Sequence, residues 1–288
     1  MMDFVFYYYN PSTAAAVIFL VLFGISALLH SYQLFRTRTW LMIPFLLGAY
    51  METIGYIGRL LSAQQAPDFT QSPYIMQSLL LLIAPAFLAA SIYMILGRII
   101  RMIEAEKAAL IRVSWMTKIF VAGDVLSFLM QASGAGLMVS SSSGPSLGEK
   151  VIIGGLFVQI IFFGFFTISA IIFQTRVARS PTGRSVELQK VWTSHMVTLY
   201  TTSILILIRS VVRVVEYIQG YDGFLMKHEV FIYIFDALPM LIAVLAMSYD
   251  HPSEINCILG RGEVYSENVI KTRKFVPASV LELGEERV

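Results

Sequence analysis

The sequence predicts an all-α integral membrane protein, a bundle of seven transmembrane helices with its N-terminus outside and its C-terminus in the cytoplasm. Seven stretches of roughly twenty apolar residues run along the chain, and a helix needs about twenty residues to cross a hydrocarbon core about 30 Å thick. Composition argues against a water-soluble protein, since 57% of the residues are hydrophobic and only 14% are charged. In addition, Lys and Arg fall almost wholly in alternate loops.

Each apolar stretch defines one expected span by its length. The seven spans are Ala14–Leu34, Trp40–Leu61, Tyr74–Gly97, Trp115–Val139, Val151–Phe173, Val191–Val214 and Val230–Tyr249. The residues before the first span lack the basic segment of a cleavable signal, so we expect that span to remain as a membrane anchor.

The distribution of basic residues predicts the orientation, because positively charged loops resist translocation. Basic residues cluster after the first, third and fifth spans and in the tail: Arg36, Arg38, Arg98, Arg101, Lys107, Arg112, Arg176, Arg179, Arg184, Lys190, Arg261, Lys271, Arg273, Lys274 and Arg287. Loops on the opposite side hold only Lys150 and Lys227. The basic side is therefore expected to be cytoplasmic.

Two regions are expected from the composition along the chain. Residues 1–250 form a single seven-helix domain, because no long soluble segment interrupts the spans. Residues 251–288 are mixed in charge and poor in aromatic side chains, which predicts a flexible cytoplasmic tail.

Polar residues recur at helical spacing inside the spans, so they share faces that we expect to point inward. A charged side chain near the bilayer centre costs about 2.5 to 3.5 kcal/mol, and it persists there only if it faces other helices or water. The candidate substrate-binding residues are Glu52, Tyr56, Arg59, Asp124, Gln131, Gln159, Arg209, Arg213, Glu216, Glu229 and Asp236.

Two interpretations of these charges stay open. Buried ion pairs, for example Glu52 or Asp236 with Arg209, would fix the helix packing without carrying a substrate. Alternatively, the charges line a polar cavity that opens outward. The five acids exceed the three arginines by two, which suits a cationic or amine-bearing amphiphile. In that hypothesis Asp124, Glu52 and Asp236 meet the amine, and the arginines hold the acids in place.

Two prolines inside the spans are candidate hinges. Pro85 is followed by small residues in the third span, and Pro239 lies in the seventh. A proline frees a backbone carbonyl and bends a helix. A packing kink would explain Pro85 equally well.

Several function classes lack their motifs. There is no phosphate-binding loop for ATP hydrolysis, and no lysine in the seventh span for retinal. His30, His195 and His251 fall near the cytoplasmic ends of three spans, where imidazoles could bind zinc, but their spacing matches no metalloenzyme signature. We expect no metal, no cofactor, no enzyme activity and no nucleic-acid partner. A receptor remains open on topology alone.

Six short motifs in order resemble the fungal RTA-like, lipid-translocating exporter family. They comprise Glu52, Gly55, Tyr56 and Arg59; Ala84, Pro85, Ala86, Ala89, Ala90 and Tyr93; Gly123, Asp124, Gln131 and Gly134; Gln159; Arg209, Arg213 and Glu216; and Glu229, Tyr233, Asp236 and Pro239. The match runs from the second span through His251 and Pro252.

The resemblance implies a multi-pass protein of the plasma membrane or an endomembrane, the former being favoured. It implies export or translocation of sphingoid long-chain bases and resistance to toxic amphiphiles such as aminosterols. Some relatives are linked to porphyrin or haem movement, so a porphyrin transporter is an alternative, as is a receptor or membrane stress sensor without transport. No established binding residues come with the family. Gly154, Gly155 and Gly164 could pack within the bundle or in a homo-oligomer.

Overall fold

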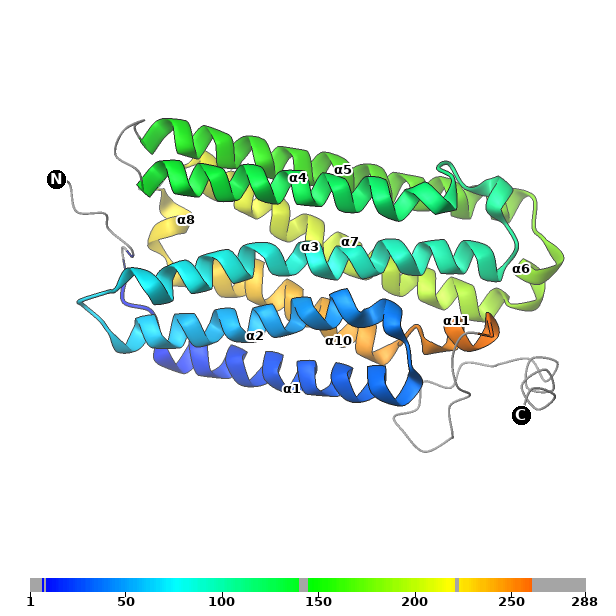
Figure 1. Ribbon diagram of the computed structural model, residues 1–288, viewed down its shortest axis with the longest axis horizontal. Helices are drawn as coiled ribbons and strands as arrows, with labels where there is room; N and C mark the ends of the chain where they lie inside the picture. The colour runs from blue at the N-terminus through cyan, green and yellow to red at the C-terminus, as the bar shows by residue number, and fades with distance from the viewer. Residues whose placement is uncertain (1–6, 8, 140–144, 221–222, 261–288) are drawn as a thin grey trace.

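Seven long helices of the computed structural model lie side by side along one axis (Figure 1). The structure describes residue 7, residues 9–139, 145–220 and 223–260. The membrane-length helices are α1 Thr13–Thr37, α2 Ile43–Gln64, α3 Gln71–Met102, α4 Val113–Val139, α5 Pro145–Arg179, α7 Gln189–Ile218 and a seventh unit that runs from Glu229. The fold class expected from the sequence, a multi-pass membrane protein of seven helices, is confirmed.

Short helices connect or extend the long ones. They are η1 Trp40–Met42, η2 Glu106–Ala108, α6 Gly183–Glu187, α8 Phe224–Lys227 and α11 Ser253–Ile258. We call the end where α1, α3 and α5 begin the N-terminal end of the bundle, and the opposite end the C-terminal end. Figure 1 places α8 at the N-terminal end, and α6 and α11 at the C-terminal end. Which end faces the cytoplasm stays a prediction.

The seventh span is divided, where the sequence predicted one helix from Val230 to Tyr249. It consists of α9 Glu229–Ile232, a π-helical turn η3 Tyr233–Ala237 and α10 Leu238–Tyr249. Such π-turns are uncommon and often occur at functional sites. Pro239 follows directly in the first turn of α10, and because the helix continues from η3 without a break, its missing N–H removes one donor from the helical hydrogen bonds. Its role as a hinge stays a prediction.

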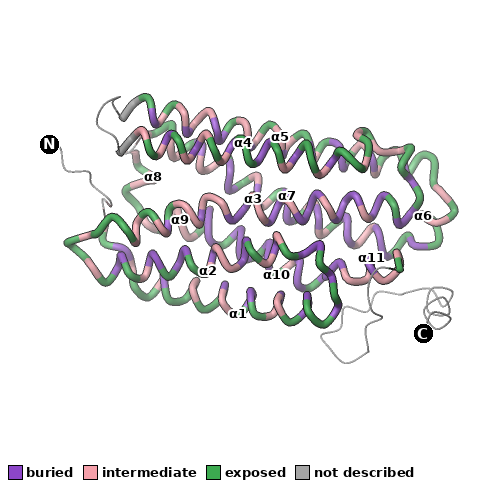
Figure 2. Tube along the Cα trace, in the orientation of Figure 1, coloured by how far each residue is buried: buried purple, intermediate pink, exposed green. Residues whose placement is uncertain are grey.

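The surface and the core have the polarity expected of a membrane protein. The exposed side chains on α1 include Ile18, Ile25 and Leu28, which are 56%, 60% and 65% exposed. Figure 2 shows buried segments on the inward sides of α3, α7 and α10. The largest fully buried side chains include Arg59 and Arg209. Apolar groups therefore face outward, while ionisable groups lie between the helices.

Glycines allow the closest helix contacts. A Cβ atom on Gly55 of α2 would lie 2.7 Å from Leu81 Cδ2 on α3, and one on Gly134 of α4 would lie 2.7 Å from the Gly148 carbonyl oxygen on α5. Gly155 of α5 also packs within the bundle, since a Cβ atom added there would lie 2.9 Å from the Ser127 backbone oxygen on α4. Gly164 meets nothing within 4 Å, so its use in a homo-oligomer stays a prediction.

The segment after Asp250 differs in part from the flexible tail expected from residue 251. Helix α11 packs against α3, its Ile255 and Asn256 are buried, and Arg98 of α3 donates to the Asn256 side chain. These contacts anchor the segment through Ile258. Residues 261–288 lie outside the described residues, and the division of the chain at residue 250 stays a prediction.

Candidate functional site

The first part of the candidate site is a buried ion pair at the N-terminal end. Arg59 of α2, whose side chain is 0% exposed, donates from Nη2 to Glu229 Oε1 of α9 over 2.7 Å. Its Nε donates to the Tyr233 hydroxyl over 2.8 Å, and Nη2 also reaches the Tyr9 hydroxyl at 3.1 Å. Tyr233 in turn donates to Glu229 over 3.1 Å. Hydrogen bonds to both charges offset part of their desolvation cost.

The same carboxylate holds the start of the first helix. The Ser12 backbone N–H lies 2.9 Å from both Glu229 oxygens, and the Ser12 side chain caps α1 by accepting from the Ala15 N–H. Nearby, the Tyr7 hydroxyl donates to Gln77 of α3 over 2.9 Å. Burial raises the pKa of Tyr7, so this hydroxyl stays protonated and remains a donor. The N-terminal segment is thus attached to α9 and α3.

A double-mutant cycle on this pair is expected to show strong coupling. Arg59→Gln and Glu229→Gln, alone and together, should give an interaction free energy of about 1–3 kcal/mol, because each single change leaves the other charge buried. Unfolding of the purified protein in detergent measures all four forms. An interaction below about 0.5 kcal/mol would mean that the pair adds nothing to the neutral hydrogen bonds around it.

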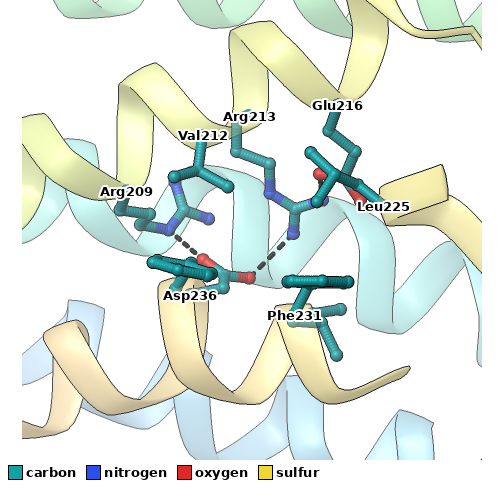
Figure 3. Close-up of a pocket in the computed structure, with 9 residues that line it drawn as sticks. Arg209, Val212, Arg213, Glu216, Leu225, Phe231 and Asp236 are labelled. Atoms are coloured by element: carbon teal, nitrogen blue, oxygen red, sulfur yellow. Dashed lines mark hydrogen bonds and ion pairs between the residues drawn. The ribbon is translucent and has the colours of Figure 1, made fainter. Parts of the chain in front are cut away.

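The second part is a carboxylate shared by two arginines. Asp236 of η3 pairs through Oδ1 with Arg209 Nε and through Oδ2 with Arg213 Nη2, the latter at 2.8 Å. Arg213 also pairs with Glu216 Oε2 at 3.0 Å. Figure 3 shows Asp236 pointing up from η3 between the two guanidinium groups of α7. Of the two pairs considered from the sequence, Asp236 with Arg209 is formed.

Pro85 supplies a further partner to this group. A proline at position 85 has no N–H for the carbonyl of residue 81, four positions earlier in the helix. Arg209 Nη2 donates to this Leu81 oxygen over 2.5 Å. Helix α3 continues through the proline from Gln71 to Met102. The proline therefore opens a backbone acceptor that one buried guanidinium occupies, and its role as a hinge stays a prediction.

A pocket lies beside the shared carboxylate, between α7 and the segment from α8 to η3 (Figure 3). It is lined by Arg209, Val212, Arg213, Glu216, Leu225, Phe231, Ile232, Phe235 and Asp236. The rings of Phe231 and Phe235 stack with centroids 6.2 Å apart. Charged groups and apolar rings thus border one small space.

Glu52 and Tyr56 lie deeper, on the inner face of α2. Glu52 is 2% exposed, and within the described part of the chain its carboxyl group forms no ion pair and Oε1 has no hydrogen-bond partner. The charged groups that act on it are Asp236, Arg209 and Arg213. Tyr56 stacks on Phe19 and Phe23 of α1. The ion pair of Glu52 with Arg209, also considered from the sequence, is not formed.

The remaining candidates form a second polar group between α3, α4 and α5. Asp124 accepts from the Tyr93 hydroxyl over 2.9 Å. Gln131 donates to Ser127 over 2.7 Å and to Gln159 over 3.3 Å. None of the three predicted residues Asp124, Gln131 and Gln159 is among those that line the pocket. A direct meeting of Asp124 with the same amine stays a prediction.

The three histidines lie apart from the pocket, toward the C-terminal end. His195 Nδ1 lies 3.4 Å from Asp250 Oδ2, and its Nε2 lies 3.3 Å from Glu254 Oε2. His30 Nε2 lies 2.9 Å from the Val244 oxygen. Among the described residues, no group of three or more His, Cys, Asp or Glu is arranged to hold a metal.

Some residues of the site had no assigned role in the sequence analysis. Tyr9 and Ser12 precede the first span, and their partners lie 50 and 217 positions away, so no local pattern points to them. Phe231 and Phe235 are different, since their spacing of four places both rings on one helical face. That aromatic pair was the available signal.

Comparison with known proteins identifies the family of this chain. The sequence model of the "RTA1 like protein" family matches residues 45–256. The chain is 41% identical over 280 residues to protoporphyrin uptake protein 1 of Saccharomyces cerevisiae, covering 85% of this chain and 91% of that protein. It is 38% identical to protein RTA1 of the same yeast, with 84% and 83% covered.

A more distant relative carries a different name. The sphingoid long-chain base transporter RSB1 of Saccharomyces cerevisiae is 27% identical over 276 residues, with 84% of this chain and 72% of that protein covered. No solved structure matches the chain significantly. The extent of the family match and the two relatives above 30% identity establish that this chain belongs to the RTA1-like family.

Proposed function

We propose that this protein is a membrane transporter for amphiphiles that carry an amine head group, with sphingoid long-chain bases as the representative substrate. The observation that carries the proposal is the pocket between α7 and η3, which joins buried charges to the stacked rings of Phe231 and Phe235. The polar head would enter among the charges, while the apolar tail stays in lipid beside the rings. The relative named as a sphingoid base transporter supports this substrate class.

The balance of charge favours a cation. Three carboxylates pair with the three arginines of the site: Glu229 with Arg59, Asp236 with Arg209 and Arg213, and Glu216 with Arg213. Glu52 and Asp124 have no arginine partner among the described residues. They account for the surplus of two acids counted from the sequence. A bound amine would reduce the surplus, whereas an anion would have to displace a carboxylate from a guanidinium group.

A porphyrin is the second candidate substrate, and the observation that favours it is the relative named as a protoporphyrin uptake protein, at 41% identity. The flat face formed by Phe231 and Phe235 would suit a macrocycle. Its carboxylates, however, would need guanidinium groups that already have partners.

We place the N-terminal end of the bundle, and with it the pocket, on the outer side of the plasma membrane. The support is the excess of Lys and Arg in the loops at the other end. Export of a toxic amphiphile to this side would contribute to resistance. The relatives' names describe transport or membrane proteins, and we propose no catalytic step for this chain.

Liposomes that contain only the purified protein test the proposal. A fluorescent sphingoid base should cross faster than in protein-free liposomes, and Phe231→Ala should slow it about tenfold, since losing an aromatic contact of roughly 1.4 kcal/mol changes a rate by that factor. Phe157→Ala is the matched control, because this ring of α5 is 47% exposed and outside the pocket.

The outcomes separate the candidates. Movement of a porphyrin in place of the base would establish the second substrate. No movement of either by a folded protein would favour a receptor or stress sensor. Equal slowing by the Phe231 and Phe157 variants would contradict the assignment of the pocket as the pathway.

A further inference from the structure

The charged cluster at the N-terminal end is balanced without Glu52. Its three guanidinium groups belong to Arg59, Arg209 and Arg213, and its three paired carboxylates to Glu229, Asp236 and Glu216. An ionised Glu52 would therefore add one uncompensated negative charge to the interior.

The surroundings of Glu52 offer nothing to compensate that charge. The arginines that face it from α7, Arg209 and Arg213, are both bound to Asp236, which faces it from η3. On its own helix, Arg59 is bound to Glu229, and the Tyr56 hydroxyl has no hydrogen-bond partner among the described residues. With 2% of the residue exposed, solvent offers the carboxyl group little compensation either. A carboxyl group in such a place holds its proton until a cation arrives.

We propose that Glu52 is a site at which a proton and the ammonium group of the substrate compete, so that each amine that binds displaces one proton. The inference rests on the proposed function for the identity of the amine. Glu52 is the member of the cluster suited to this role, because every other acid there already has a guanidinium partner.

The exchange is balanced in atoms and charge. The neutral Glu52 carboxyl group and the ammonium cation give a carboxylate–ammonium pair. The displaced proton passes to water on the side from which the amine entered. Release is the reverse, in which a proton from water restores the neutral carboxyl group and frees the ammonium cation. Asp236 keeps its two arginines throughout, so neither Asp236 nor Glu52 is left as a carboxylate without a cationic partner. Net movement of the amine would thus be opposed by movement of a proton.

Two measurements on the detergent-solubilised full-length protein test the exchange without relying on transport. Sphinganine is the probe, and N-acetyl sphinganine, which has no ammonium group, is the control ligand. A pH indicator should report about one proton released for each sphinganine bound. Infrared difference spectra should show the band of a protonated carboxyl group decreasing when sphinganine binds.

Glu52→Gln and Glu254→Gln form the matched pair of variants. Glutamine resembles the neutral acid in shape, so Glu52→Gln should fold normally yet lose both the proton release and the infrared change. Glu254→Gln should keep both, because Glu254 lies toward the C-terminal end beside His195 and does not line the pocket. In the native protein, the apparent dissociation constant for sphinganine should fall about tenfold for each unit by which the pH is raised, as long as the free Glu52 carboxyl group is protonated.

Each outcome decides the inference. Binding of sphinganine without proton release, or an infrared change that persists in Glu52→Gln, would overturn it. So would proton release with N-acetyl sphinganine. If Glu52→Gln failed to fold, the stoichiometry and the pH dependence of the native protein would still decide. If exchange occurred but the base never crossed liposomes, the transport function would fail while the exchange site stood.

Discussion

Asp236→Asn is expected to lower the free energy of unfolding by about 3 to 5 kcal/mol, because removing one partner of a buried ion pair leaves the other charge uncompensated. Here a single carboxylate serves two guanidinium groups, and the residue is 7% exposed. Arg209 would keep only the Leu81 carbonyl, and Arg213 only Glu216. Unfolding of the purified variant in detergent, followed by circular dichroism, measures the loss.

Glu216→Gln is the matched control, since it removes a carboxylate from the same Arg213 but leaves Asp236 in place. Its cost should be about 1 kcal/mol, the value of an ordinary hydrogen bond. Adding Arg213→Gln to Asp236→Asn should recover part of the lost stability, because it removes one of the stranded charges. Equal stability of Asp236→Asn and Glu216→Gln would show that Asp236 is not the shared counter-ion.

Gly134→Val is the second substitution with a large expected effect. The Cβ atom of any residue here would lie 2.7 Å from the Gly148 carbonyl oxygen and 2.9 Å from the Ile152 backbone nitrogen of α5. Backbone atoms cannot yield as a flexible side chain can, so α4 and α5 must separate. Overpacking of this kind costs typically about 1–3 kcal/mol, and we expect the upper end of that range.

Gly136→Val provides the control on the same helix. A Cβ atom at Gly136 meets nothing within 4 Å, so the valine should enter open space and change the stability by less than about 0.5 kcal/mol. Thermal unfolding of both variants in the same detergent compares them directly. Similar losses of stability at the two positions would show that the effect comes from the helix propensity of valine and not from the contact between α4 and α5.

The sequence was sufficient for the number and position of the spans, because the length of an apolar run relates directly to bilayer thickness. It also identified the charges that meet at the N-terminal end. The spacing of Arg209 and Arg213, and that of Glu229 and Asp236, shows that each pair lies on one face of its helix. Such a pattern indicates an inward face, and in the structure Asp236 pairs with both Arg209 and Arg213, while Glu229 pairs with Arg59.

The pairing itself could not be predicted from spacing. Helical spacing indicates that Asp124 faces inward, but the helix that it faces depends on where α4 lies in the bundle. In the structure α4 packs mainly on α5 and α3. Whether Glu52 or Asp236 would bind Arg209 depended on a π-turn in the seventh span, for which no sequence pattern was recognised. Leu81 and Ser12 take part through their backbone groups, which bind the distant side chains of Arg209 and Glu229, and side-chain patterns do not encode such contacts.

The order in which the chain is made gives the divided seventh span a further importance. Arg59 is synthesised 170 residues before Glu229, and Arg213 is synthesised 23 residues before Asp236. Each arginine therefore enters the membrane before its main carboxylate partner does, at an insertion cost of about 2.5 to 3.5 kcal/mol. Helix α9 and η3 bring both missing carboxylates together, near the end of synthesis. Completion of the seventh span is thus the event that neutralises the bundle, and a nascent chain that stops before it holds Arg59 and Arg209 without a counter-ion.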